Sequence, residues 1–244
     1  MYGLIGKKLS HSFSADFFNK KFQKEGIDEE YRLFPIPDID DFPLLLALNP
    51  DLKGLNVTIP YKQQVIPFLS DISEEAKKIG AVNVIKIIPE NENITLKGYN
   101  TDVIGFRESL IPLLHENVKE ALILGTGGAS KAVAYVLDSL GIKNTFVSRS
   151  PKEGQIAYSS ITPEIISKNL LIVNTTPLGM FPNIEEYPAI PYQYLTPEHI
   201  CYDLIYNPAE TQFMKNSALN GAQVKNGLEM LELQALAAWD IWTE

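Results

Sequence analysis

The stretch ALILGTGGASKAVAYVL, residues 121–137, contains a run of apolar residues, a glycine-rich turn and a second run with helical apolar spacing. This order predicts a buried strand, a tight turn and a helix. Glycines at 125, 127 and 128 let the backbone pass close to a pyrophosphate, and the free N–H groups at the start of the helix then face that anion. The spacing is Gly-x-Gly-Gly-Ala-Ser instead of a strict Gly-x-Gly-x-x-Gly, so a plain tight turn is the alternative interpretation of these residues alone.

The predicted strand that follows ends in residues that bear on the choice of nucleotide. In NAD-binding units, an acidic residue about twenty residues past the glycines binds the ribose 2′-hydroxyl. This chain has Ser148, Arg149 and Ser150 there, with Lys152 just beyond. An arginine and a lysine suit a 2′-phosphate, so the sequence favours NADP over NAD, and solvated charges closing a loop are the alternative.

On both sides of this stretch, short apolar runs rich in β-branched residues alternate with runs of helical spacing. The alternation predicts an α/β protein whose parallel sheets are covered by helices on both faces. Strands are expected at residues 2–6, 31–36, 52–59, 81–88, 94–100, 120–125, 144–150, 169–175, 199–206 and 221–225, and helices near 14–25, 38–48, 61–79, 101–114, 129–140 and 227–242.

The elements fall into two series, which predicts two domains that meet near residue 101. The first series forms an N-terminal domain at residues 1–101, and the second forms a nucleotide-binding domain at residues 102–226. The remaining segment, residues 227–244, is a strongly apolar helix with no strand after it. Its sequence alone leaves both domains open as its packing partner.

The composition argues against several classes of function. The chain has 244 residues, of which 45% are hydrophobic and 21% charged, as in an ordinary soluble globular protein. No apolar run approaches the ~20 residues that span a bilayer. A net charge of −9 without a basic run argues against nucleic acid as a partner. A single cysteine fits a reducing cytoplasm, and the histidines lie too far apart in the sequence to predict a metal site.

Several predicted strands of the first domain end in polar residues. GLNVTIPYK, residues 54–62, carries Thr58 and Lys62 at its end, the short run AVN ends in Asn83, and GYNTD ends in Asn100, Thr101 and Asp102. Ligands of open α/β sheets bind at the carboxyl ends of the strands. A cap, a turn or a satisfied buried amide explains each residue alone, but their recurrence predicts a site for one small hydroxylated molecule.

The ordered set of motifs resembles the shikimate dehydrogenase family over nearly the whole chain. The matching segments are GLIGKKLSHSFS, GLNVTIPYK, GAVNVI, GYNTDVIGF, LGTGGAS, NTTPLGM, YDLIYNPAET and GLEMLELQA. The resemblance implies an N-terminal α/β substrate domain, a Rossmann-type NADP domain and a C-terminal helix, residues 227–244, that returns to the substrate domain. It also implies the reduction of 3-dehydroshikimate to shikimate with NADPH in the biosynthesis of chorismate and the aromatic amino acids.

The resemblance also implies roles for individual residues around the substrate. The carboxylate of the substrate would be held by Ser12, Ser14 and Tyr206, its ring hydroxyls by Thr58, Asn83 and Gln234, and the catalytic pair would be Lys62 and Asp102. Hydride addition to a carbonyl leaves negative charge on its oxygen, and an ammonium group beside that oxygen stabilises the charge and supplies a proton. Lys62 is therefore expected to act as an electrostatic and proton-donating group in the reducing direction, oriented by Asp102.

Further residues match positions that bind the cofactor in the family. They are Gly125, Gly127, Gly128 and Ala129 at the pyrophosphate, Ser148, Arg149, Ser150 and Lys152 at the adenosine phosphate, Leu204 and Gly227 beside the nicotinamide, and Glu74 at a weaker contact. The segment between Arg149 and Asn174 is short, so the helix that is usual there in the family is expected to be reduced to a turn at residues 161–168.

Two other functions stay open on the sequence. An NAD-preferring quinate/shikimate dehydrogenase would carry an acidic residue near position 148. A non-catalytic shikimate-binding sensor on the same fold would lack Lys62 or Asp102, or would carry an added DNA-binding segment. None of these features is in the sequence. The expected partners are small molecules, bound by a monomer or a homodimer.

Overall fold

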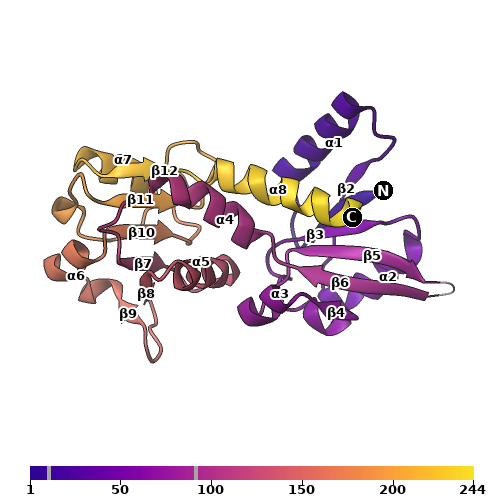
Figure 1. Cartoon of the computed structure of the whole chain (residues 1–244), viewed down its shortest axis with the longest axis horizontal. Helices are drawn as coiled ribbons and strands as arrows, with labels where there is room; N and C mark the ends of the chain where they lie inside the picture. The colour runs from indigo at the N-terminus through magenta and orange to yellow at the C-terminus, as the bar shows by residue number, and fades with distance from the viewer. Residues whose placement is uncertain (10–11, 91–92) are drawn as a thin grey trace. The chain divides into compact units, whose positions relative to one another are not determined.

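The computed structural model describes residues 1–9, 12–90 and 93–244 of the chain. It consists of two compact units (Figure 1), of which the first is formed by Met1–Thr101 with Ala235–Glu244 and the second by Asp102–Gln234. The division falls directly before Asp102 and inside the last helix, α8 (Leu228–Thr243).

The first unit is built on a mixed sheet with strand order β2-β1-β3-β5-β6-β4. Strands β1, β2 and β3 are parallel, whereas β5 runs antiparallel to both β3 and β6. The strands are β1 (Tyr2–Gly6), β2 (Tyr31–Pro35), β3 (Gly54–Val57), β4 (Asp71–Ile72), β5 (Val84–Glu90) and β6 (Asn93–Tyr99), and the helices are α1 (Phe13–Glu25), η1 (Ile39–Asp41), α2 (Phe42–Leu48), η2 (Ile66–Phe68) and α3 (Glu74–Ile79).

Helices cover both faces of this sheet because its central strands are apolar on both sides. On β1, Leu4 points to a core shared with α1 and the end of α8, while Ile5 points to a core shared with α2. Figure 1 shows α1 and the C-terminal part of α8 on one side of the sheet, with α2 and α3 on the other.

The end of α8 is fixed to the first unit by Trp242. Its indole Nε1 donates to the carbonyl of Ile85 at 3.0 Å, and its ring stacks on Tyr2 with centroids 4.9 Å apart. A β-carbon on Gly54 would lie 2.3 Å from the indole nitrogen, so only glycine leaves room for the ring there. The last ten residues therefore belong to the core of the first unit.

The second unit is an all-parallel sheet with strand order β12-β11-β10-β7-β8-β9. Its strands are β7 (Glu120–Leu124), β8 (Lys143–Ser148), β9 (Ile156–Ala157), β10 (Leu171–Asn174), β11 (Ile200–Asp203) and β12 (Gln223–Lys225), and its helices are α4 (Asp102–Leu110), η3 (Ile111–Leu113), α5 (Gly128–Ser139), η4 (Tyr158–Ser160), α6 (Pro163–Lys168), η5 (Tyr192–Tyr194), α7 (Gln212–Leu219) and the first turns of α8.

Both faces of this sheet are also buried. Cys201 and Leu122 face a core that includes Phe213 of α7, whereas Tyr202 faces α4, where its hydroxyl lies 2.7 Å from that of Ser109. The carboxyl ends of all these parallel strands meet at one edge of the sheet, which is where the glycine-rich turn lies.

Three expectations from the sequence differ from the structure. One helix over residues 61–79 is wrong: the segment forms η2, β4 and α3, because Pro67 cannot donate the hydrogen bond of a helix interior. All-parallel pairing is wrong for β5, which forms an antiparallel hairpin with β6. The stretch at 161–168 contains a short helix, α6, instead of a turn alone, because Thr162 caps it by accepting from the N–H of Ile165.

Candidate functional site

In the first unit, the polar residues after β1 and β3 leave the sheet at the same edge. The N–H of Thr58 donates to the carbonyl of Ile5 at 3.0 Å, and a β-carbon on Gly6 would lie 2.7 Å from Cγ2 of Thr58. Thr58 therefore sits against the end of β1, because the glycine there leaves space for it.

Lys62 and Asn83 lie in neighbouring segments at this edge. The carbonyl of Lys62 accepts from the N–H of Val82 at 2.7 Å, directly before Asn83. Asn83 is 3% exposed, and its side chain bonds Thr101, whose N–H donates to Oδ1 at 2.7 Å while Nδ2 donates to Oγ1 of Thr101 at 3.1 Å. The end of the first unit's chain is thus held beside the segment that carries Lys62.

The two serines of the first loop have different environments. Ser12 is the N-cap residue of α1, but its hydroxyl makes no capping hydrogen bond. Ser14, in the first turn of α1, is buried and its hydroxyl bonds the phenol of Tyr31. Tyr31 in turn donates to Oδ1 of Asn56 at 2.6 Å, and burial raises its pKa well above the usual value for tyrosine. Tyr31 was not predicted as part of the site, and its place in a strand gave no signal for it.

A neighbouring amide carries a buried oxygen with unused hydrogen-bonding capacity. Asn100 donates from Nδ2 to the carbonyl of Ala81 at 3.0 Å. Across residues 1–9, 12–90 and 93–244, its Oδ1 is the one buried side-chain polar atom with no hydrogen-bond partner. A buried acceptor of this kind suits a hydroxyl donor from a ligand, because leaving it unmet costs free energy.

Asp102 and Gln234 are brought together within the second unit. Asp102 begins α4 and is 7% exposed, as is Gln234 in α8. Between them the two helices touch at Gly105, where a β-carbon would lie 2.3 Å from the carbonyl oxygen of Met230 and 3.1 Å from Cβ of Gln234. The absence of a side chain at Gly105 lets the turn that begins with Asp102 pack against the turn that carries Gln234.

The glycine-rich turn has the form that the sequence predicts. Gly125 follows β7 with a φ of 102°, and a β-carbon there would lie 2.9 Å from Oγ1 of Thr175 after β10. Gly127 is the N-cap of α5, and a β-carbon on it would have no atom within 4 Å. The turn is therefore closed on its Thr175 side and open at Gly127.

The start of α5 fits a pyrophosphate. No side chain caps the helix, so its first N–H groups, from Gly128 and Ala129 onward, keep their hydrogen-bonding capacity and the positive end of the helix dipole. The open space at Gly127 admits a phosphate group to these donors, and Ser130 instead bonds the carbonyl of Gly127 at 2.6 Å.

The residues after β8 place positive charge at the same edge of the sheet. Ser148 accepts from the N–H of Ser150 at 3.2 Å, which fixes a turn that presents Arg149 on the surface. Burial raises the pKa of the Tyr158 phenol, and the positive charge of Arg149 partly offsets this rise. Lys152, exposed like Arg149, begins the next turn through its N–H bond to Gln155 at 3.1 Å.

Leu204 and Gly227 are in direct contact. A β-carbon on Gly227 would lie 2.1 Å from the carbonyl oxygen of Leu204, and the N–H of Gly227 donates to the carbonyl of Ile205 at 3.0 Å. Tyr206 follows with a side chain that is 37% exposed, and partial burial raises the pKa of its phenol. These residues form the other end of the edge that carries the glycine turn.

Glu74 begins α3 in the first unit and forms an exposed ion pair with Lys77 at 2.8 Å. The structure thus assembles the predicted residues in two groups. The first unit contains Ser12, Ser14, Thr58, Lys62, Glu74 and Asn83. The second unit contains Asp102, the glycine turn, Ser148 to Lys152, Leu204, Tyr206, Gly227 and Gln234.

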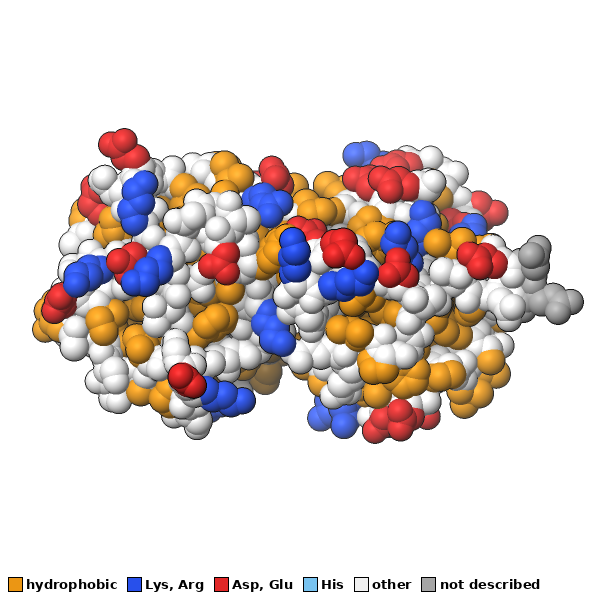
Figure 2. Space-filling view, turned by 60° about the horizontal axis from the view of Figure 1, so that its bottom comes forward, with side chains coloured by type: hydrophobic (Ala, Val, Ile, Leu, Met, Phe, Trp, Pro, Cys, Tyr) orange, Lys and Arg blue, Asp and Glu red, His pale blue; other side chains and the backbone are white. Residues whose placement is uncertain are grey.

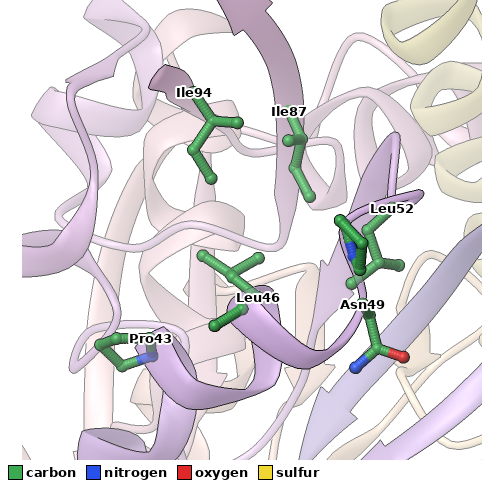
Figure 3. Close-up of a pocket in the computed structure, with 8 residues that line it drawn as sticks. Pro43, Leu46, Asn49, Leu52, Ile87 and Ile94 are labelled. Atoms are coloured by element: carbon green, nitrogen blue, oxygen red, sulfur yellow. The ribbon is translucent and has the colours of Figure 1, made fainter. Parts of the chain in front are cut away.

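An apolar pocket of the first unit has a different chemistry. It has a volume of about 400 Å³ and is lined by side chains of α2, β5 and β6 that include Leu46, Ile87 and Ile94 (Figure 3). Asn49 is its polar side chain, and none of its lining residues is charged. It offers no group for acid–base work, so it is not the candidate active site.

The surface of the protein carries charges of both signs. Figure 2 shows Lys and Arg side chains dispersed among Asp and Glu on the visible face, without one continuous basic field. Within the described ranges, no cluster of three His, Cys, Asp or Glu side chains has a metal-binding arrangement. No helix in that part of the chain is long and apolar enough to cross a membrane.

Comparison with known proteins gives matches over the full chain. A family model described as the shikimate dehydrogenase substrate binding domain matches residues 4–85. A protein of Clostridium beijerinckii named shikimate dehydrogenase (NADP(+)) is 41% identical over 255 residues, which cover 100% of this chain and 92% of the relative.

Solved structures share the whole architecture. Shikimate 5-dehydrogenase from Thermus thermophilus, in complex with NADP(H) and shikimate, has a TM-score of 0.86 and 28% identity, covering 99% of this chain and 92% of that one. Quinate dehydrogenase from Corynebacterium glutamicum, in complex with NAD, has a TM-score of 0.87 and 28% identity, covering 99% and 93%. Proteins crystallised with NADP(H) and with NAD thus share this fold, so the fold alone does not determine which of the two cofactors is preferred.

Proposed function

Because the chain belongs to the shikimate dehydrogenase family, we propose that it reduces 3-dehydroshikimate to shikimate with NADPH, a step in the biosynthesis of chorismate and the aromatic amino acids. The observation that carries the proposal is the set of polar side chains at the edge of the first sheet where β1 and β3 end and β5 begins. The match to the C. beijerinckii enzyme over 100% of this chain supports the same reaction.

The substrate carboxylate would be bound by the hydroxyls of Ser12 and Ser14, with Tyr206 as a third donor. A carboxylate accepts hydrogen bonds from hydroxyls at its two oxygens, and these bonds are stronger than those to a neutral acceptor. Ser12 suits this role because its hydroxyl is not used to cap α1. Ser14 suits it because its bond to the buried Tyr31 restricts the orientation of its side chain.

The ring hydroxyls would be bound by Thr58, Asn83 and Gln234. A hydroxyl group both donates and accepts, so amides and a hydroxyl are matching partners. Thr58 is fixed against Gly6, and Asn83 is fixed by Thr101. Preorganised donors and acceptors of this kind reject molecules that lack the hydroxyl, because buried polar groups of the protein would then remain unpaired.

Lys62 and Asp102 would perform the chemistry at the reacting oxygen. As the carbonyl becomes an alcohol, its oxygen gains negative charge and then a proton. The Lys62 ammonium stabilises that charge and donates the proton from Nζ, and Asp102 orients the ammonium and accepts a hydrogen bond from a neighbouring hydroxyl of the substrate. NADPH, when bound, supplies the hydride.

The cofactor would be held along the carboxyl edge of the second sheet. The uncapped start of α5, with Gly125, Gly127, Gly128 and Ala129, would take the pyrophosphate. Arg149 and Lys152, with the hydroxyls of Ser148 and Ser150, would take the 2′-phosphate. Leu204 and Gly227 would line the nicotinamide, and Glu74 would make a weaker contact.

An NAD-preferring quinate/shikimate dehydrogenase and a shikimate-binding sensor are less well supported. The first would need an acidic group after β8, where this chain has Ser148 and Arg149. The second would be expected to lose Lys62 or Asp102, and both are present. We further propose that the protein is cytoplasmic, since its one cysteine, Cys201, cannot form a disulfide within the chain and fits a reducing compartment. We propose that it acts there as a monomer or a homodimer.

The proposal is tested by initial rates of shikimate oxidation with NADP and with NAD. Turnover with NADP at a kcat/KM at least about tenfold above that with NAD is the expected result. Equal rates with the two cofactors would contradict the role of Arg149 and Lys152. Binding of shikimate without turnover would leave the sensor as the better description.

A further inference from the structure

The last residue of β11, Asp203, is a carboxylate in the core of the second unit. It is 0% exposed, and the roles proposed for substrate and cofactor do not use it. Three donors surround it. Asn174 Nδ2 and the N–H of Ile205 donate to Oδ1 at 3.0 Å each, and Thr211 Oγ1 donates to Oδ2 at 2.6 Å.

These donors come from three different segments. Asn174 ends β10, Ile205 follows β11, and Thr211 is the N-cap residue of α7, where its hydroxyl also accepts from the N–H of Met214 at 3.3 Å. The carboxylate therefore joins the ends of two strands to the start of a helix. We call Asn174, Asp203 and Thr211 the β11 clasp.

The clasp fixes the backbone of the next two residues. The N–H of Leu204 donates to the carbonyl of Asn174 at 3.0 Å, and Ile205 bonds Asp203 through its N–H and Gly227 through its carbonyl. The backbone of Leu204 is thus held by Asn174 through its N–H and packs against Gly227 through its carbonyl. A displacement of the clasp would move the surface that Leu204 and Gly227 present together.

A buried carboxylate is a costly way to hold a loop. Its desolvation raises the pKa of Asp203 from 3.8 to about 6, although all three donors favour the charged form. Neutral hydrogen-bonding side chains could join the same segments with a smaller free-energy cost of desolvation. An ionised oxygen pair accepts from all three donors at once and bonds each more strongly than a neutral acceptor does.

We propose that Asp203 is a positioning residue for the nicotinamide half of the cofactor, acting through Leu204, Ile205 and Gly227 with Thr211 as its partner. This inference rests on the proposed function for the identity of the cofactor. The adenosine end is assigned to the turn after β8, which bonds through Ser148 and Ser150 and contains no member of the clasp. The clasp therefore acts on one half of the cofactor and not on the other.

The test compares Thr211→Val with Thr211→Ser in the full chain. Valine removes the hydroxyl and keeps the shape, whereas serine keeps the hydroxyl. NADPH affinity is measured by fluorescence titration, and adenosine 2′,5′-bisphosphate, which carries only the adenosine end, is titrated as a competitor. Thr211→Val is expected to weaken NADPH by about tenfold, the effect of one charge-assisted hydrogen bond, and to leave the bisphosphate within about twofold. Thr211→Ser is expected to match the wild type.

Ser217→Ala is the matched control for stability. Ser217 lies in the same helix, is 0% exposed and bonds the carbonyl of Phe213 at 2.7 Å, so its loss perturbs α7 without touching the clasp. Asp203→Asn provides a second, isosteric variant that keeps two of the three acceptor contacts, and it is expected to weaken NADPH selectively as well.

Equal loss of NADPH and bisphosphate affinity in Thr211→Val, or loss of thermal stability with unchanged NADPH affinity, would overturn the inference. Shikimate oxidation by the wild type is measured in parallel. If the wild type binds NADPH and the variants give the selective loss, but shikimate is not oxidised, the proposed reaction fails while the role of Asp203 stands. If shikimate is oxidised and the selective loss is absent, the role of Asp203 fails alone.

Discussion

Asn83 and Thr101 bond each other in both directions, Thr101 through its N–H to Oδ1 at 2.7 Å and Asn83 through Nδ2 to Oγ1 at 3.1 Å. Both residues are buried, and Thr101 is directly followed by Asp102. The pair thereby fixes the start of β5 beside the end of the segment that leads to Asp102. Asn83, which is proposed to bind the substrate, is therefore held in one orientation by Thr101.

Asn83→Ala is predicted to raise the KM for shikimate by at least about tenfold, because it removes both an amide proposed to bind the substrate and the partner of Thr101. The unpaired Thr101 N–H should also lower the free energy of unfolding by about 1–3 kcal/mol. Steady-state kinetics and urea unfolding measure the two effects. Thr101→Ser, which keeps the hydroxyl, is the control and should change neither quantity appreciably. An unchanged KM in Asn83→Ala would argue against its role at the substrate.

Arg149→Ala is predicted to lower kcat/KM with NADP by about 10- to 100-fold and with NAD by less than about threefold. The guanidinium can bond a 2′-phosphate through charge-assisted hydrogen bonds, which NAD cannot accept. The control is Lys143→Ala, at the opposite end of the same strand, where another exposed cation is lost. If both variants reduced the NADP rate alike, general charge and not a 2′-phosphate site would explain the preference.

Gly227→Ala is predicted to weaken NADPH binding strongly while shikimate binding is retained. The added methyl group would lie 2.1 Å from the carbonyl oxygen of Leu204, so the Leu204 segment has to move. Equilibrium titration of the two ligands separately measures the effect. Leu228→Ala, which changes the exposed next residue, serves as the control. NADPH affinity within about twofold of wild type would contradict the assignment of this contact to the nicotinamide.

Asp203 makes stability depend on pH. Its folded pKa of about 6 lies above the ordinary 3.8, so the folded state binds the proton more tightly than the unfolded state does. For a raised acid pKa, the contribution to stability is greatest below the unfolded value and is lost as the pH rises through the folded value. Between pH 5 and pH 8, the loss is about 1.5 kcal/mol.

Asp203→Asn cannot titrate, so its free energy of unfolding relative to wild type should rise by about 1.5 kcal/mol from pH 5 to pH 8. Urea unfolding of both proteins at a series of pH values measures this difference. Ser217→Ala serves as a control that should follow the wild-type pH dependence. A difference between Asp203→Asn and wild type that stays constant with pH would show that the Asp203 carboxyl is not titrating in this range.

The sequence predicted well where local signals and tertiary packing agree. The glycine turn, β7 and α5 follow directly from residues 121–137, because the apolar run, the small residues and the helical spacing all favour the same structure. The first turn of α4 at Asp102 was predicted for the same reason, and β8, predicted at residues 144–150, was found at Lys143–Ser148.

It failed where packing overrides local spacing. Apolar residues from Val65 to Leu69 have helical spacing, yet Pro67 breaks the helix and they pack into the core beside Phe42. Helix α7 was not predicted, although Thr211 ahead of it is a recognisable N-cap. The antiparallel β5 and β6 cannot be told from parallel strands by their composition.

The site residues were predicted from motifs, whereas their supports were not. Tyr31 gave no sequence signal, because it acts through a hydrogen bond to Asn56, 25 residues away in the chain. Asn174 and Thr211 lie in the motifs NTTPLGM and YDLIYNPAET, but their hydrogen bonds to Asp203 are visible only in the fold. Gly105 and Gly227 belong to the recognised motifs GYNTDVIGF and GLEMLELQA. The reasons why glycine is needed there, the backbone of Met230 beside Gly105 and that of Leu204 beside Gly227, are visible only in the fold.

In the proposed mechanism, Lys62 stabilises the negative charge on the reacting oxygen and donates a proton to it, and the proposed reaction depends on that role. The most direct measurement is kcat for shikimate oxidation in Lys62→Ala, together with the dissociation constant for shikimate, and Lys78→Ala, an exposed lysine of α3, serves as the control. We predict a fall in kcat of about 100- to 10,000-fold, with shikimate affinity largely retained and the control unchanged. A kcat for Lys62→Ala within about tenfold of wild type would contradict this role.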